Sequence, residues 1–259
     1  MEPSIYEYPA IFRRVHMEKP GELVAEIDFL TRVWRRHLKR PVRRVLDVAC
    51  GDSPHGVALA RDGIAVAGVD RSPTMIAAGR KAAGDAPIRF YRRSIARFRI
   101  PERPFDAAFF MSETFPIMTG NRALLSHLAS VGRLLRRGGL YCVDIDRHDG
   151  VELVAARRLW RQRNVRAEGI GVNVREYHRP IAWHSGMHSI YELECVLHFP
   201  DRDVVTRDVV PVRYTLPCLL DLAARASRYF TMVAAYADLS FSKPIESCYG
   251  RWLGVLKRV

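Results

Sequence analysis

Acidic and glycine residues that could hold a nucleoside cofactor gather around one short turn, Asp47–Gly56. An apolar run precedes this turn, helix-like sequence follows it, and Asp70 ends the next apolar run. In doubly wound sheets, ligands bind outside the carboxyl ends of the strands, where a strand passes into a helix. A carboxylate at the end of the second strand can accept two hydrogen bonds from a ribose diol. This arrangement predicts a nucleoside-cofactor site.

The charge and the glycine pattern of the turn indicate which kind of nucleoside cofactor it could bind. A dinucleotide site has three glycines so that the backbone can approach a pyrophosphate. Here Ser53 stands at the middle position, between Gly51 and Gly56. Asp47 and Asp52 add negative charge, which opposes a pyrophosphate and suits a cationic ligand.

P-loop chemistry is excluded at the same turn. Gly51 and Gly56 have P-loop spacing, but Val57-Ala58 stand where a lysine and a serine or threonine are required. Nucleotide hydrolysis is therefore excluded.

Alternating strands and helices are expected to position these residues. Strands separated by single helices imply a parallel sheet with right-handed crossovers, and hence an α/β fold class. Ser72 is the expected N-cap of a helix that begins at Pro73, and Gly138-Gly139 are expected to stop a later helix. The expected strands are 44–49, 64–69, 88–91, 105–111 and 140–145, and the expected helices are 21–38, 54–61, 73–83 and 123–135.

After Asp149 the pattern changes to alternation with a period of two, which predicts a small antiparallel sheet over about 165–214. A helix and two last strands, near 230–236 and 252–256, close the chain. We interpret this part as interleaved with the first rather than as a separate domain. The expected segments are an N-terminal lid and helix (1–40), a cofactor-binding half (41–149), an antiparallel β insertion on the acceptor side (150–214) and a C-terminal part of the same domain (215–259).

Four segments in register resemble the motifs of the class I S-adenosylmethionine-dependent methyltransferases. They are Leu-Asp-Val-Ala-Cys-Gly at 46–51, Gly-Val-Asp-Arg-Ser-Pro-Thr-Met at 68–75, Phe-Asp-Ala-Ala-Phe-Phe-Met-Ser at 105–112 and Leu-Leu-Arg-Arg-Gly-Gly-Leu at 134–140. The resemblance covers about residues 40–146. It implies a doubly wound, Rossmann-like seven-stranded sheet, mostly parallel with the last strand antiparallel. The insertion after the fifth strand resembles that of the small-molecule subgroup.

The resemblance implies S-adenosylmethionine as cofactor and S-adenosylhomocysteine as product. Tyr6, in a segment that resembles the lid of small-molecule members, would cover the methyl group. Ser94 stands where the family often has an acid. The implied cofactor contacts are Asp47 and Gly51 with the aminoacyl end, the backbone of Ala49 and Cys50, Asp70 with the ribose, Arg71, Met75, Ser94 and Ile95 near the adenine, and Met111 and Ser112 beside the sulfonium.

Composition limits the cellular setting. Lys+Arg number 41 against 28 Asp+Glu, a net charge of +13, which keeps a nucleic-acid partner open. The five cysteines are scattered and form no CxxC pair, which is typical of reduced thiols in a cytoplasmic protein. No run of apolar residues is long enough for a membrane-spanning helix, and the N-terminus resembles no signal peptide.

Several single residues have competing interpretations. Asp144, Asp146, His148 and Asp149 could together hold a divalent cation, and His178, His184 and His188 could bind zinc or supply a base. We expect no metal and assign no catalytic residue. His55 is interpreted as structural or cofactor-adjacent, and His127 as a helix-face residue.

The expected function is transfer of a methyl group to an N or O nucleophile of a small molecule. Methyl transfer is an in-line displacement that depends mainly on alignment, which can contribute several kcal/mol and up to about 7–11 in ideal cases. A nucleic-acid methyltransferase and a non-catalytic cofactor-binding protein remain the alternatives. The sequence leaves the acceptor and the oligomeric state open.

Overall fold

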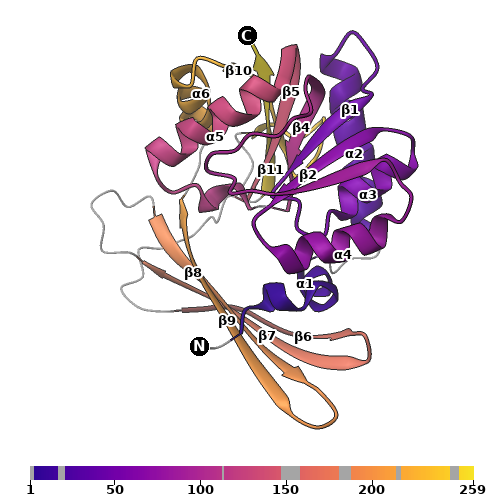
Figure 1. Ribbon diagram of the computed structural model, residues 1–259. Coiled ribbons are helices and arrows are strands. Elements are labelled where there is room, and N and C mark those ends of the chain that lie inside the picture. The colour runs from indigo at the N-terminus through magenta and orange to yellow at the C-terminus, as the bar shows by residue number, and fades with distance from the viewer. Residues whose placement is uncertain are drawn as a thin grey trace. The chain divides into compact units, whose positions relative to one another are not determined.

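The computed structural model of the chain forms two compact units (Figure 1). The seven-stranded unit comprises residues 21–149 and 215–259, and the four-stranded unit comprises residues 1–20 and 150–214. Residues 150–214, interpreted from the sequence as part of a single domain, thus form a compact unit with the N-terminal segment. The structure describes residues 3–16, 21–112, 114–146, 158–180, 188–213, 217–245 and 251–259.

The seven-stranded unit contains one sheet with the strand order β3-β2-β1-β4-β5-β11-β10. The first five strands pair in parallel, and β11 pairs antiparallel with both β5 and β10. This topology confirms the expected α/β fold with an antiparallel last strand. The strands are β1 (Arg44–Val48), β2 (Ala65–Asp70), β3 (Ile88–Arg92), β4 (Phe105–Phe110), β5 (Leu135–Asp146), β10 (Phe230–Ala237) and β11 (Arg251–Arg258).

Helices cover this sheet through two apolar clusters. Alternate residues of a strand point to opposite faces, so Leu46 packs in the cluster that includes Leu128 of α5, while Val45 packs in the cluster that includes Leu30 of α2. The helices are α2 (Glu22–His37), α3 (Pro54–Arg61), α4 (Pro73–Ala83), α5 (Asn121–Leu134) and α6 (Pro217–Ala226), with a short 3-10 turn η2 (Phe115–Ile117).

Strand register places the expected site at one edge of the sheet. Val48 of β1 pairs with Val69 of β2, so the turn that follows β1 lies beside Asp70. Cys50 extends this pairing, because its backbone N–H donates to the Val69 carbonyl at 3.0 Å. The Ser72 hydroxyl caps α4 by accepting from the Met75 amide, as expected.

The expected end of α5 near Leu135 is confirmed to within one residue, but the role expected for Gly138-Gly139 in stopping the helix was wrong. The helix ends at Leu134, and β5 begins at Leu135. Both glycines lie within β5, between Leu135 and Leu140, where the register with β4 shifts. A Cβ on Gly139 would lie 2.8 Å from the Arg136 carbonyl oxygen, so glycine here permits a close backbone approach.

The four-stranded unit is an antiparallel meander with the order β6-β7-β8-β9. The sheet starts at Arg158, earlier than the sequence pattern indicated. Ser4 and the Ile5 amide both donate to the Asp208 carboxylate, which ties the N-terminal turn to β9. The elements are η1 (Ile5–Glu7), α1 (Pro9–His16), β6 (Arg158–Ala167), β7 (Ile170–Pro180), β8 (His188–His198) and β9 (Asp203–Arg213).

In the described ranges, no helix has the length and apolar character that crossing a bilayer requires.

Candidate cofactor-binding site

The turn after β1 has an unusual backbone that faces open space at Gly51. Ala49, Gly51 and Ser53 have positive φ angles of 53°, 54° and 56°. Non-glycine residues adopt this conformation at a cost of about 1–2 kcal/mol, and such strain is concentrated at functional sites. A Cβ on Gly51 would meet no heavy atom within 4 Å. A ligand can therefore approach the backbone at this point.

Gly56 has a different role, which is to leave room for a side-chain hydrogen bond. A Cβ at this position would lie 2.2 Å from Ser53 Oγ and 2.9 Å from Asp47 Oδ2. The Ser53 hydroxyl donates to that Asp47 oxygen at 2.6 Å. Glycine at position 56 therefore makes room for the hydrogen bond between Ser53 and Asp47. The segment from Gly51 to Gly56 is an acidic turn rather than a phosphate-binding loop.

Asp47 is a buried carboxyl group whose pKa is raised far above its ordinary value. Its side chain is 4% exposed. Burial raises the pKa of Asp47 to about 7, although the hydrogen bond from Ser53 and the charge of His55 oppose this rise. The nearby charge of Asp70 acts in the same direction as burial. A cationic ligand at the turn would favour the ionised form of Asp47.

Asp70 is held by the backbone and keeps acceptor capacity for a ligand. The Gly51 N–H donates to one carboxylate oxygen at 2.9 Å, and the Ser72 N–H donates to the other at 2.8 Å. A carboxylate has about four lone-pair positions, so each oxygen can accept one further hydrogen bond. This donor set fits a ribose diol.

The other sequence-predicted residues differ in accessibility. Arg71, beside Asp70, and Ser94, after β3, are exposed, while Ile95 is half-buried. Ser112, beyond the end of β4, is exposed and has a φ of 61°. Tyr6 lies in the four-stranded unit, where its ring packs 4.7 Å from that of Phe12. Cys50, Met75 and Met111 are buried, as Asp47 is.

A buried ionic network lies beside the turn, and no sequence pattern indicated it. His55 Nε2 lies 2.6 Å from a carboxylate oxygen of Glu26 on α2. The other Glu26 oxygen pairs with Arg251, the first residue of β11. Arg251 also binds both oxygens of Asp144 on β5, at 2.8 and 2.6 Å. Because each buried carboxylate here has a cationic partner, the network joins α2, α3, β5 and β11 behind the turn.

This network changes the interpretation of the acidic residues that end β5. Asp144 is fully buried and paired with Arg251, which assigns it to the network. The Asp146 side chain, His148, Asp149, His184 and the side chains of His178 and His188 lie outside what the structure describes. The described residues contain no group of three or more candidate ligands that could hold a metal ion.

A second buried histidine fixes the connection after β3. His127 of α5 lies 2.7 Å, through Nδ1, from the Ile95 carbonyl oxygen, and 2.6 Å, through Nε2, from the Tyr141 hydroxyl. Because a carbonyl can only accept, Nδ1 donates and Nε2 accepts from Tyr141. Burial lowers the pKa of His127 to about 4, so the ring is neutral near pH 7. The interpretation as a helix-face residue missed these contacts.

Comparison with known proteins agrees with this geometry. Residues 45–139 match the family model described as "Methyltransferase domain". A glycine/sarcosine N-methyltransferase from Parasynechococcus marenigrum is 30% identical over 129 residues, covering 48% of this chain. The chain spans 42% and 44% of the lengths of the two curated relatives it matches.

Solved structures share the fold over nearly the whole chain. An S-adenosylmethionine-dependent methyltransferase from Clostridium acetobutylicum is 14% identical, with a TM-score of 0.77 and coverage of 97% of each chain. An amino pentose methyltransferase from Micromonospora echinaspora, solved with S-adenosylmethionine bound, is 18% identical, with a TM-score of 0.72, and covers 100% of this chain and 98% of its own.

The chain therefore shares its fold with S-adenosylmethionine-dependent methyltransferases of known structure. Residues 45–139, which match the methyltransferase-domain model, contain both the turn after β1 and Asp70. The antiparallel four-stranded sheet is the addition that the sequence resemblance implied.

Proposed function

We propose that this chain is an S-adenosylmethionine-dependent methyltransferase that acts on an N or O nucleophile of a small molecule. The observation that carries the proposal is the pairing of an acidic, open turn with Asp70, whose oxygens are oriented by the Gly51 and Ser72 amides. The match of residues 45–139 to a methyltransferase domain supports it. When bound, S-adenosylmethionine supplies a methyl group on a sulfonium.

The chain's own residues have separable roles in this proposal. Asp47 and Gly51 hold the aminoacyl end with the backbone of Ala49 and Cys50, and Asp70 accepts from the ribose hydroxyls. The proposed adenine and sulfonium neighbours are Arg71, Met75, Ser94, Ile95, Met111 and Ser112. Of these, Met75 has no exposed surface, so its part is to pack beneath the site. Tyr6 is proposed as a lid residue.

A small-molecule acceptor is supported by what the relatives act on. One is named for glycine and sarcosine, and solved neighbours are named as sugar and amino pentose methyltransferases. We propose the cytoplasm as the site of action, and the thiols of Cys50, Cys142, Cys195 and Cys218, which are all free, support this location.

Calorimetric titration with S-adenosylhomocysteine tests the proposal. We expect binding to the wild-type chain and a large loss in Asp70→Ala, with Asp62→Ala, an exposed carboxylate at the end of α3, as the matched control. Absence of binding at millimolar ligand would overturn the cofactor assignment. Turnover is tested separately by release of S-adenosylhomocysteine in the presence of amino-acid and amino-sugar acceptors, and binding without release for any acceptor would favour the non-catalytic alternative.

A further inference from the structure

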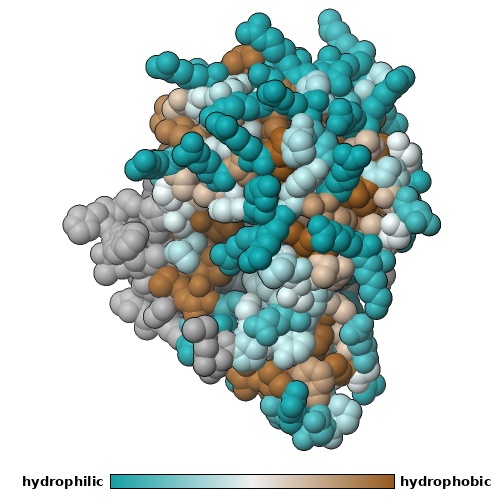
Figure 2. Space-filling model, in the orientation of Figure 1, coloured by the Kyte–Doolittle hydropathy of each residue, from teal (hydrophilic) through white to brown (hydrophobic). Residues whose placement is uncertain are grey.

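The connection from β3 to β4 leaves one side of α5 uncovered. Residues 93–104 of this connection form neither helix nor strand, although a crossover between parallel strands usually contains a helix that covers the sheet. Arg122, Ser126, Ala129 and Arg133 follow one another along one side of α5, at helical spacing. Hydrophilic side chains crowd the visible surface of the seven-stranded unit (Figure 2).

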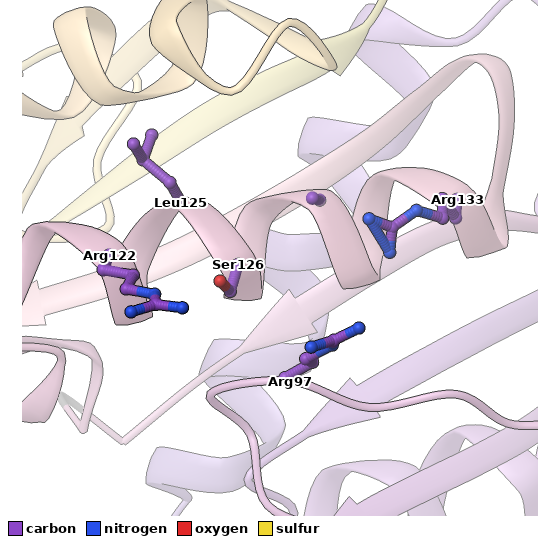
Figure 3. A pocket seen from close by; sticks show the side chains of 6 residues that line it. Arg97, Arg122, Leu125, Ser126 and Arg133 are labelled. Carbon is purple, nitrogen blue, oxygen red and sulfur yellow. The ribbon is translucent and has the colours of Figure 1, made fainter.

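A hollow of about 510 Å³ lies between this side of α5 and the connection (Figure 3). Its volume is within the range of small-molecule sites, about 300–1,000 Å³. The guanidinium groups of Arg97, Arg122 and Arg133 turn toward the space beside Ser126. The lining residues are Arg97, Arg122, Leu125, Ser126, Ala129 and Arg133.

The charges in this hollow are not balanced by the protein. No acidic side chain lines it. Within the described ranges, neither Arg97 nor Arg122 has an ion pair or a hydrogen-bonded partner. Arg133 donates through Nε to the Tyr229 hydroxyl at 3.2 Å, which orients the guanidinium without neutralising it. Three like charges that share one hollow repel each other, and an anion in contact with them removes that repulsion.

The walls of the hollow are fixed relative to each other. His127 of α5 donates to the Ile95 carbonyl at 2.7 Å, and the Phe98 amide donates to Ser130 Oγ of α5 at 3.2 Å. These two hydrogen bonds lie on either side of Arg97 in the sequence. The backbone at Arg97 is therefore held beside α5 before any ligand arrives, which lowers the entropy that this segment loses on binding.

We propose that this hollow binds a compact anion that carries at least two phosphate groups, with pyrophosphate as the model ligand. Arginine forks pair with phosphate in a bidentate manner. A diphosphate has enough oxygens to serve three guanidinium groups and the Ser126 hydroxyl, whereas a single carboxylate has two. The lining contains no aromatic ring on which nucleic-acid bases could stack, which favours a small anion over a nucleic-acid strand.

Titration calorimetry with pyrophosphate tests this site. The test variant is Arg122→Gln/Arg133→Gln, and the control is Arg35→Gln/Arg202→Gln, which also removes two exposed positive charges but elsewhere on the chain. We expect binding to the wild-type chain, roughly tenfold weaker binding in Arg122→Gln and roughly 100-fold weaker binding in the double variant. The control is expected to remain within about twofold of wild type, since the site is local.

Three results would overturn the proposal. These are no binding of pyrophosphate at millimolar concentration, unchanged binding in the test variant, and equal losses in test and control variants, which would reveal a general effect of net charge. A single-stranded oligonucleotide is titrated in parallel across salt concentrations. Oligonucleotide binding with a steep salt slope that the test variant abolishes, without pyrophosphate binding, would replace the small anion by nucleic acid. S-adenosylhomocysteine binding is expected to persist in the test variant, so this outcome is independent of the proposed function.

Discussion

Cofactor affinity is expected to depend on pH through Asp47, because only the ionised carboxyl group attracts an ammonium group. Burial raises the pKa of Asp47 to about 7. On this basis, about 1% of Asp47 is ionised at pH 5 and about three quarters at pH 7.5. If only the ionised form binds, the apparent Kd equals the intrinsic Kd divided by that fraction. Affinity is therefore expected to rise about 75-fold between these pH values.

The assay is titration with S-adenosylhomocysteine at constant ionic strength across this pH range. Its α-amino group stands beside a free carboxylate, which raises the pKa of the ammonium above the value of about 7.7–8.0 for a peptide N-terminus, so the ligand stays protonated and the change arises from the protein. Asp47→Asn is expected to bind weakly at every pH, with the slope removed. Equal affinities at the two ends of the range, or a slope that survives in Asp47→Asn, would refute the reasoning.

The raised pKa of Asp47 also predicts how stable Asp47→Asn is. Measuring that stability shows whether the variant has lost binding alone or has also lost its fold. Because the folded pKa of Asp47 is raised, the folded chain binds more protons than the unfolded chain between about pH 4 and pH 7. Stability from Asp47 is therefore fully present below about pH 4 and is lost as pH rises through about 7, by up to about 4 kcal/mol. Asp47→Asn is expected to be at least as stable as wild type at about pH 8 in urea denaturation.

Three further predictions concern the groups that support the turn. Asp70→Asn places an amide NH₂ against the Gly51 or Ser72 N–H, so S-adenosylhomocysteine binding is expected to weaken roughly tenfold or more in calorimetry. Arg251→Met removes the cation that Glu26 and Asp144 share and is expected to cost about 3–5 kcal/mol in urea denaturation near pH 7, whereas an unchanged midpoint would show that the network is not stabilising. His127 has a pKa lowered to about 4 by burial, so its contribution to stability is expected to be lost as pH falls from about 6.5 to 4, by up to about 3 kcal/mol. His127→Gln should flatten the acid limb of stability against pH, and an unchanged limb would contradict this assignment.

Local sequence signals were sufficient to predict the fold and the turn. The glycines, the acid at each strand end and the alternation of apolar runs with helices all act over a few residues, and the strand register then brings the turn beside Asp70. The helix stop at Gly138-Gly139 failed because a glycine pair serves equally at the end of a helix and within an irregular strand. Only the packing of β5 against β4 decides between the two.

Long-range pairs gave no such signal. Glu26, His55, Asp144 and Arg251 lie on four different elements, and none has a spacing that indicates its partners. Asp144 therefore resembled a metal ligand in the sequence, although the structure pairs it with Arg251. His127 was ambiguous for the same reason, since its two partners come from the connection after β3 and from β5.

The positions of the charged residues indicate more about ligand binding than the net charge of the chain does. The chain carries a net charge of +13, yet the buried groups around the cofactor turn are mainly carboxyl groups. The acidic turn after β1 suits a ligand that bears an ammonium and a sulfonium. The hollow beside α5, in contrast, is lined by three arginines and by no acidic residue. Exposed charges further apart than the Debye length of about 8 Å act almost independently in physiological salt. A basic surface and an acidic cofactor turn are therefore compatible in one unit, and each selects a ligand of opposite charge.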